Sequence, residues 1–221
     1  MKQLRVPRLE SGDRLSRSEF ERRYKLSPED VKAELIEGVV YVASPVRVRN
    51  HGKPHGQIMT WLGVYSASTP GVDFADNSTV RLDLDNEPQP DAILWIESKF
   101  GGRSRITEDD YIEGAPELVV EIAASSVSVD MNAKLNAYRR NGVQEYLVWQ
   151  VYENQIAWFS LEESEYVLLP SIEGVIQSRI FPGLWLAIDA LTSGDLASVL
   201  AVMQQGLESS EHQEFKNRLK N

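Results

Sequence analysis

The chain has 221 residues, of which 42% are hydrophobic, carries a formal net charge of −10 and contains no cysteine. This content suffices for one buried core of ordinary domain size, and no apolar run approaches the roughly 20 residues that cross a bilayer. The lack of cysteine excludes disulfides, thiolate nucleophiles and cysteine zinc sites, and the basic start at residues 1–7 has no apolar stretch behind it, unlike a signal peptide. We therefore expect a soluble, cytoplasmic protein with no membrane segment.

The first half of the chain alternates helical and strand patterns. Ser16 and Glu19 have the spacing of a capping box, which predicts a short helix after them. Residues 33–43 favour a hairpin that turns near positions 37 and 38, and the alternating residues 80–84 favour a half-exposed strand. A helix over residues 57–67 is indicated by apolar residues at helical spacing, namely Ile58, Trp61, Leu62 and Tyr65.

The second half contains the most apolar strands. Residues 92–96 and 118–123 predict buried strands, joined by a polar surface connection over residues 97–117. A helix is predicted from about residue 130 to the Asn141–Gly142 stop signal. Further predicted elements are strands at 146–151, 156–160 and 166–169, an amphipathic helix at 191–203, and a tail from 208 onward that is either a last helix or frayed.

This mixed order of elements predicts a mixed α+β fold with one mixed β-sheet flanked by helices, not a strictly alternating parallel fold. We expect residues 1–190 to form the main domain, with a helical lead-in at its start. Residues 191–221 are then a C-terminal helical extension of the same domain.

Glu121 is out of place in the apolar run LVVEIA. Side chains alternate along a strand, so Val119, Glu121 and Ala123 share one face. An isolated ionised carboxylate in a covered strand costs several kcal/mol unless it is paired or binds a metal. The alternatives to a functional role are pairing with an arginine and an edge position that faces water.

Asp91 and Lys134 are two further candidates. Asp91 opens a strand directly after Pro90, which is also an ordinary turn pair. Lys134 falls on the flank of the helical stripe formed by Met131, Leu135 and Tyr138, so it points near the core side. Its alternative reading is a lysine whose charged head reaches water.

Together these residues predict a divalent-metal site. Asp91 and Glu121 would be the metal ligands, because carboxylate oxygens suit hard cations such as Mg²⁺ or Mn²⁺. A bound cation stabilises charge on a phosphoryl oxygen and lowers the pKa of its water. Lys134 would orient that water or stabilise the transition state.

Glu34 and His55 are weaker candidates for the same site. Glu34 opens the first hairpin strand, and its alternative is a solvent-facing residue. His55 begins the stripe of the helix that follows, where a structural histidine is favoured over a catalytic one. His51 and His55 have the i, i+4 spacing of a metal pair. Pro54, however, favours a first helical turn that leaves His51 outside the helix, which argues against zinc.

The same residues carry a family resemblance. Glu34–Gly38, Ser44–Pro45, His55, Pro90–Asp91, Pro116–Ile122, Asp130, Lys134, Tyr138 and Gly142–Tyr146 occur in the order of the Uma-type restriction-endonuclease-like family, within the PD-(D/E)XK nuclease superfamily. The chain resembles that family over roughly residues 15–190.

The resemblance implies a nuclease-type sheet and Mg²⁺-dependent phosphodiester chemistry, with Asp91 and Glu121 binding the metal. Ala123 stands where the superfamily's ExK lysine is expected. In this family the lysine comes from the following helix, which here is Lys134.

Two functions are therefore compared. The first is a metal-dependent endonuclease that hydrolyses DNA, acts as a homodimer and is favoured by the set Asp91, Glu121 and Lys134. The second is a non-catalytic binding or assembly module that retains the nuclease fold. It is favoured by the acidic net charge, since nucleic-acid binding depends on Lys and Arg neutralising phosphates.

Overall fold

The centre of the fold is a six-stranded mixed sheet with the strand order β11-β10-β9-β8-β5-β3. The structure is a computed structural model that describes residues 6–28, 30–43 and 47–220, so residues 1–5 and the Ser44–Pro45 pair lie outside it. β8 and β9 run parallel, and every other neighbouring pair of this sheet is antiparallel. The strands are β3 (Val72–Asp76), β5 (Ala92–Ile96), β8 (Leu118–Ala123), β9 (Glu145–Gln150), β10 (Gln155–Glu162) and β11 (Glu165–Leu168). The predicted mixed α+β fold is confirmed.

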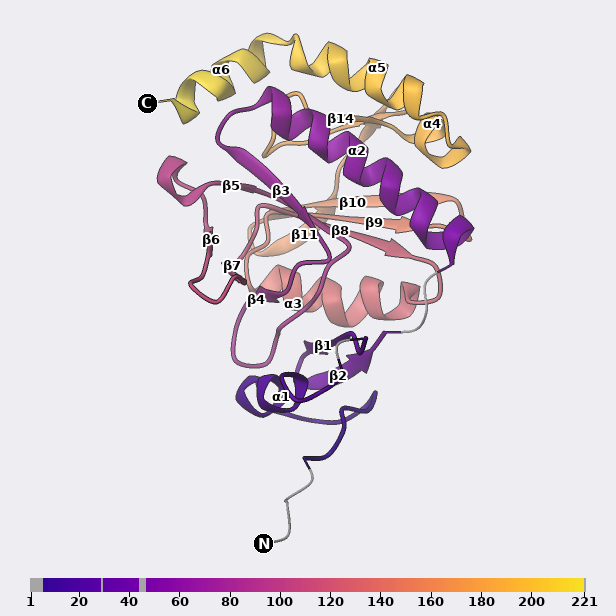
Figure 1. Cartoon of the computed structure of the whole chain (residues 1–221). Helices are drawn as coiled ribbons and strands as arrows, with labels where there is room; N and C mark the ends of the chain where they lie inside the picture. The colour runs from indigo at the N-terminus through magenta and orange to yellow at the C-terminus, as the bar shows by residue number, and fades with distance from the viewer. Residues whose placement is uncertain (1–5, 29, 44–46, 221) are drawn as a thin grey trace, which may run out of the picture.

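Helices cover both faces of this sheet (Figure 1). Helix α2 (Lys53–Ser68) lies on one face with the C-terminal helices, and α3 (Leu135–Arg140) lies on the other. The side chains of β8 (Leu118–Ala123) point alternately to these two sides of the sheet. Val120 and Ile122 join the core on the α2 side, whereas Val119 and Ala123 join the core that contains Tyr138 of α3. Glu121 therefore faces α3.

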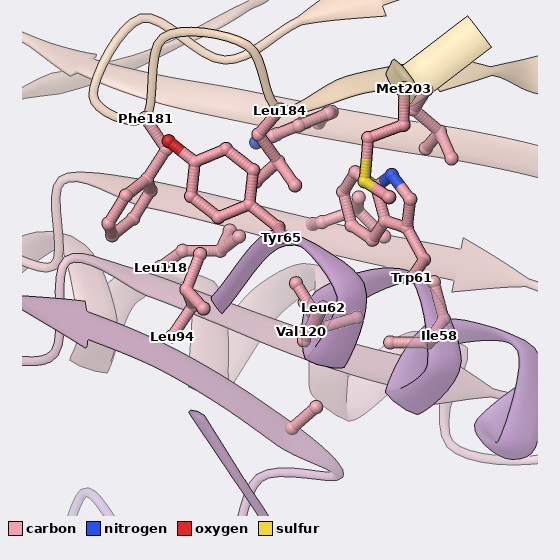
Figure 2. Packing of buried hydrophobic residues seen from close by; sticks show 14 of the residues in the cluster. Ile58, Trp61, Leu62, Tyr65, Leu94, Leu118, Val120, Phe181, Leu184 and Met203 are labelled. Carbon is pink, nitrogen blue, oxygen red and sulfur yellow. The ribbon is translucent and has the colours of Figure 1, made fainter. Parts of the chain in front are cut away.

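Helix α2 forms because its apolar residues recur at helical spacing and pack together against the sheet. Ile58, Trp61, Leu62 and Tyr65 are all fully buried. Figure 2 shows Trp61 and Tyr65 beside Met203, Leu184 and Phe181 of the C-terminal region. The two polar groups of these rings are satisfied by backbone carbonyls: Trp61 Nε1 donates to Trp185 O at 3.0 Å and Tyr65 Oη to Pro182 O at 2.9 Å. This packing fixes the start of α2 relative to β5 and β8.

The N-terminal elements form a separate small layer below α3 in Figure 1. They are α1 (Arg17–Tyr24), β1 (Ala33–Ile36) and β2 (Val39–Val42). The predicted hairpin is confirmed, with Ile36 opposite Val39 and positive φ at both turn residues, Glu37 and Gly38. Leu35 pairs with Glu87 through two backbone hydrogen bonds, so the hairpin is tied to the segment that leads into Asp91.

The connection between β5 and β8 is more structured than the sequence predicted. Residues 97–117 contain a 3₁₀ turn (Ser98–Phe100), β6 (Ser104–Ile106) and β7 (Ile112–Gly114). β7 pairs with both β6 and β4 (Val80–Arg81) in a separate three-stranded sheet. The buried Glu117 carboxylate accepts from the backbone N–H groups of Ile96 and Arg103 and thereby holds this loop. The predicted strand at 80–84 was too long: it ends at Arg81, and Leu84 is exposed.

The C-terminal region adds a third sheet and three helices. The sheet has the order β12 (Ser171–Ile172), β13 (Val175–Gln177), β14 (Trp185–Ala187). The helices are α4 (Ile188–Ser193), α5 (Leu196–Leu207) and α6 (Ser210–Leu219). The single predicted helix at 191–203 is wrong, because Gly194 adopts a left-handed conformation and Asp195 caps α5 by accepting from Ser198 N. In the described part of the chain, no helix is long and apolar enough to cross a membrane.

Candidate active site

Asp91 lies directly before β5, opposite the middle of β8. Ala92 pairs with Val120, and the Asp91 Oδ2 atom accepts a hydrogen bond from the Ile122 N–H at 2.6 Å. The His55 ring holds the backbone, because its Nε2 atom lies 2.9 Å from Asp91 O. β5, β8 and α2 together therefore position the Asp91 carboxylate, and His55 contacts its backbone instead of its side chain.

His51 contacts the Asp91 side chain, which the sequence analysis missed. Its Nε2 atom lies 3.3 Å from Asp91 Oδ1, and the hydrogen bond to Asp91 raises the pKa of His51 against the opposing effect of burial. His51 lies outside α2, as the position of Pro54 predicted, but it belongs to a further helical turn. A π-helical turn (Val48–Gly52) continues directly into α2, so Pro54 sits in the first α-helical turn while His51 stacks on His55 at 5.8 Å between ring centroids.

Glu121 and Lys134 form a buried pair on the α3 side of the sheet. Lys134 Nζ donates to Glu121 Oε1 at 3.0 Å, and Tyr138 Oη donates to the same oxygen at 2.9 Å. Lys134 ends a second π-helical turn (Val129–Lys134) that runs into α3. The wider turn brings the Lys134 side chain over β8, and only 4% of the residue is exposed, so the alternative of a water-reaching lysine does not hold.

Two more carboxylates surround the Lys134 ammonium. Glu34 Oε1 of β1 lies 3.0 Å from Nζ, and Asp130 Oδ1 lies 3.6 Å from it. The other oxygen of Glu34 accepts from the Gln89 N–H at 3.2 Å, which links β1 to the segment before Asp91. The structure thus brings together Asp91, Glu121, Lys134 and Glu34 as the sequence predicted, and adds Asp130 to them.

Burial and crowding of negative charge govern the electrostatics of this cluster. The pKa of Glu121 is raised well above its ordinary value by burial and by repulsion from Asp130, Asp91 and Glu34, against the attraction of Lys134. Burial also raises the pKa of Asp130. The pKa of Lys134 is raised, because the surrounding carboxylates outweigh the effect of its burial. The site therefore favours an added positive charge.

A pocket of about 910 Å³ opens over these groups. Its floor includes Asp91, Glu121 and Lys134, and its walls come from the N-terminal hairpin, the turn before α2 and the loop after β8. The pocket walls carry the aromatic side chains of Tyr41 and Tyr152 and the charged or titratable side chains of Asp30, Lys32, Arg47 and His51. A substrate group can therefore reach the carboxylates from solvent.

The donor set fits a hard cation, although the described residues contain no cluster of three or more His, Asp or Glu side chains arranged to hold one. The Lys134 ammonium occupies the position between Glu34, Glu121 and Asp130. Both described hydrogen bonds to Glu121 fall on Oε1, and the buried Asp130 Oδ1 has no hydrogen-bond partner. One or two carboxylates with several waters are a usual Mg²⁺ site, so Asp91 and Glu121 suffice.

Comparison with known proteins decides the family. A match to the family described as "Putative restriction endonuclease" spans residues 17–189. The chain belongs to this Uma2 family. The resemblance predicted from the ordered motifs is confirmed.

One solved structure similar to this Uma2 chain is that of "a putative nuclease" from Anabaena variabilis, with a TM-score of 0.59 and 17% sequence identity. The match covers 78% of this chain and 97% of that one, and at this identity it shows a shared fold. No curated protein matches the chain.

Proposed function

We propose that this Uma2 chain is a metal-dependent nuclease, with Asp91 and Glu121 as metal ligands and Lys134 as the catalytic cation. The observation that carries the proposal is the Lys134–Glu121 hydrogen bond of 3.0 Å, beside a carboxylate pair held by neighbouring strands. Membership of a family of restriction-endonuclease type supports phosphodiester hydrolysis, and we take DNA as the substrate and Mg²⁺ or Mn²⁺ as the cation.

The proposed reaction is hydrolysis of a phosphodiester. A water oxygen forms a bond to phosphorus, the ester P–O bond breaks, and the products are a phosphate monoester and an alcohol. A bound divalent cation would supply stabilisation of the phosphoryl charge and a more acidic water. Such preorganised charge stabilisation is commonly the largest catalytic contribution.

The residues of the chain have distinct roles in this proposal. Lys134 stabilises negative charge on the attacked phosphate, and Tyr138 and Lys134 fix the orientation of Glu121 through its Oε1 atom. His55 is a positioning residue, because it holds the Asp91 backbone rather than the carboxylate. Glu34 balances the Lys134 charge while the hairpin closes one wall of the pocket.

A cleavage assay tests this function. We expect the parent protein to cut supercoiled plasmid or labelled oligonucleotide with Mg²⁺ or Mn²⁺ and to stop when the metal is chelated. Glu121→Gln should lower the rate by about 100-fold or more, since it removes a ligand charge. Glu214→Gln, on the exposed face of α6, serves as the matched control and should cut like the parent.

A non-catalytic binding module is the second candidate. It is favoured by the acidic net charge of −10 and by the three carboxylates that pair with Lys134. Calorimetric titration of Mg²⁺ or Mn²⁺ into the parent and the double variant Asp91→Ala/Glu121→Ala separates the two candidates. If the protein is a metal-dependent nuclease, the double variant should bind the cation more weakly than the parent. Equal metal binding by both proteins would favour the binding module.

A further inference from the structure

Tyr152 is an exposed aromatic residue at the mouth of the pocket. It lies in the turn between β9 and β10, and 60% of its surface is exposed. Among the described residues, Tyr152 is the only exposed Phe, Tyr or Trp side chain, and the only exposed large hydrophobic residue that lines this pocket. A single exposed apolar residue elsewhere on a surface needs no explanation, but its position here places an aromatic face beside the candidate catalytic centre.

A hydrogen bond holds the Tyr152 ring in place. Asn50 Nδ2 donates to Tyr152 Oη at 3.0 Å across 102 residues of sequence. Asn50 belongs to the π-helical turn that also carries His51, the residue in contact with Asp91. The hydrogen bond therefore restricts the ring to positions near the turn that carries His51, so that a ligand stacked on it costs less side-chain freedom on binding.

Two cations complete the mouth of the pocket. Lys32 and Arg47 both line it, and within the described residues neither has an ion-pair partner. The floor is acidic and suited to a metal, whereas the mouth carries these two cations beside the exposed carboxylate of Asp30. This distribution suits a phosphate backbone that passes over the rim and places one phosphodiester above the floor.

We propose that the site takes single-stranded nucleic acid, with Tyr152 stacked on an unpaired base next to the phosphodiester that lies over Asp91 and Glu121. This inference rests on the proposed nuclease function and names its substrate class. A positive groove combined with an aromatic platform is the usual composition of single-strand binding sites, because every base offers a face for stacking.

Duplex DNA does not fit these features equally well. In a duplex, each base face is covered by its neighbours, so an aromatic side chain stacks on a base only after that base is unstacked or flipped out. The pocket volume of about 910 Å³ is within the range of small-ligand sites, of roughly 300–1,000 Å³, and corresponds to a few nucleotide groups between two walls.

Binding to the full chain in the presence of EDTA tests the inference without cleavage. The probes are a labelled oligothymidylate of about 16 nucleotides and a duplex of equal length, followed by fluorescence anisotropy. We expect tighter binding of the single strand by the parent and a loss of roughly 5- to 100-fold for Tyr152→Ala, which is the range for one base–aromatic stack. Tyr152→Phe keeps the ring but loses the hydrogen bond from Asn50, so its affinity should lie between those of the parent and Tyr152→Ala.

A second measurement reports the stack itself. With 2-aminopurine placed at successive positions of the strand, the parent and Tyr152→Phe should quench its fluorescence at one position and Tyr152→Ala should not. Ile172→Ala removes another exposed apolar side chain, outside the pocket lining, and should change neither readout. Equal single-strand affinity of Tyr152→Ala and parent, or tighter binding of the duplex, would overturn the inference.

The outcome is separable from that of the proposed function. Tyr152-dependent binding by a protein that cuts nothing would support the single-strand site and remove the nuclease. Metal-dependent cleavage with no effect of Tyr152→Ala on binding would retain the nuclease and remove the single-strand site. A comparison of oligouridylate with oligodeoxyuridylate, which differ only in the sugar, shows which nucleic acid is preferred: binding of either polymer supports the inference, and binding of neither overturns it.

Discussion

Lys134 Nζ lies 3.0 Å from Glu121 Oε1 although the two residues belong to different elements, β8 and the π-helical turn before α3. On β8 itself, Ala123 shares the face of Glu121 and is fully buried. The lysine that the superfamily's ExK pattern places two residues after the strand carboxylate is absent from β8, and the ammonium of Lys134 reaches Glu121 from the next helix, as the family resemblance implied. The site therefore pairs an ammonium with the strand carboxylate, but the lysine comes from a helical turn instead of from the strand.

Glu121→Gln should be as stable as the parent without metal, or more stable by about 1 kcal/mol. The amide keeps an oxygen for the Lys134 and Tyr138 donors, and Lys134 retains Glu34 and Asp130. A buried charge whose pKa is raised by burial and carboxylate repulsion is removed. The variant should also lose the stabilisation by Mg²⁺ or Mn²⁺. In the parent this stabilisation raises Tm and amounts to about 2.7 kcal/mol at a cation concentration of 100 times Kd.

Thermal melts with and without the cation check this expectation, with Glu214→Gln as control. Clear destabilisation of Glu121→Gln, together with no metal effect in the parent, would mean that Glu121 is only a structural partner of Lys134.

Lys134→Met should be destabilised by about 3–5 kcal/mol at neutral pH, because three carboxylates then face one another without their cation. The pKa values of Glu121 and Asp130 are already raised and should rise further in the variant. An acid whose pKa is raised on folding stabilises the fold at low pH and loses that effect as pH rises. The variant should therefore recover stability on acidification, as measured by urea unfolding at several pH values. A deficit that is constant with pH would contradict the repulsion.

Much of this site was predictable because its residues violate local patterns. Glu121 interrupts an apolar strand, and Lys134 flanks an apolar helical stripe. The hydrophobic pattern of each element was therefore enough to identify these two residues as candidates. His51 was not predictable in the same way. Its contact with Asp91 depends on a π-helical turn before Pro54, and the i, i+4 spacing with His55 was the only signal. Asp130 gave no signal beyond its place in the ordered family motifs.

The fold shows the same division. The strands at 92–96 and 118–123 were predictable because they are long and apolar. By contrast, β6, β7 and β12 to β14 have only two or three residues each, which is too short to show an alternating hydrophobic pattern. The break between α4 and α5 had a readable signal in Gly194–Asp195, a C-terminal glycine followed by an N-cap, which the apolar stripe obscured. The proposed boundary at residue 190 stays a prediction.

Glu145 predicts a pH dependence of stability that is independent of the catalytic centre. It is fully buried at the start of β9, and burial raises its pKa to about 7 although Ser178 Oγ and the Arg179 and Ile180 N–H groups donate to it. Its stabilising effect is complete below about pH 4.5 and is lost as pH rises through about 7, a change of about 3 kcal/mol.

Urea unfolding of the parent and Glu145→Gln between about pH 4.5 and pH 8 measures this contribution. The stability of the parent relative to the variant should fall by about 3 kcal/mol over that interval. Parallel profiles would show that Glu145 does not bind its proton more tightly in the folded protein.

The homodimer predicted from the resemblance stays a prediction, since the structure contains one chain. Closed two-fold dimers are the commonest homo-oligomers, and two sites would serve two strands of a duplex. Light scattering at micromolar concentration should give a mass near twice the 24.9 kDa of the chain. A mass near 24.9 kDa would contradict the dimer, and it would agree with a site that takes one strand at a time.

Diffraction from crystals soaked in Mn²⁺, with anomalous scattering, tests the central claim most directly. The account predicts an anomalous peak about 2.2 Å from oxygens of both Asp91 and Glu121, within reach of Lys134. The peak should be absent from Glu121→Gln crystals soaked in the same way. A peak on other carboxylates, or an unchanged peak in Glu121→Gln, would contradict the assignment of Asp91 and Glu121 as the metal ligands.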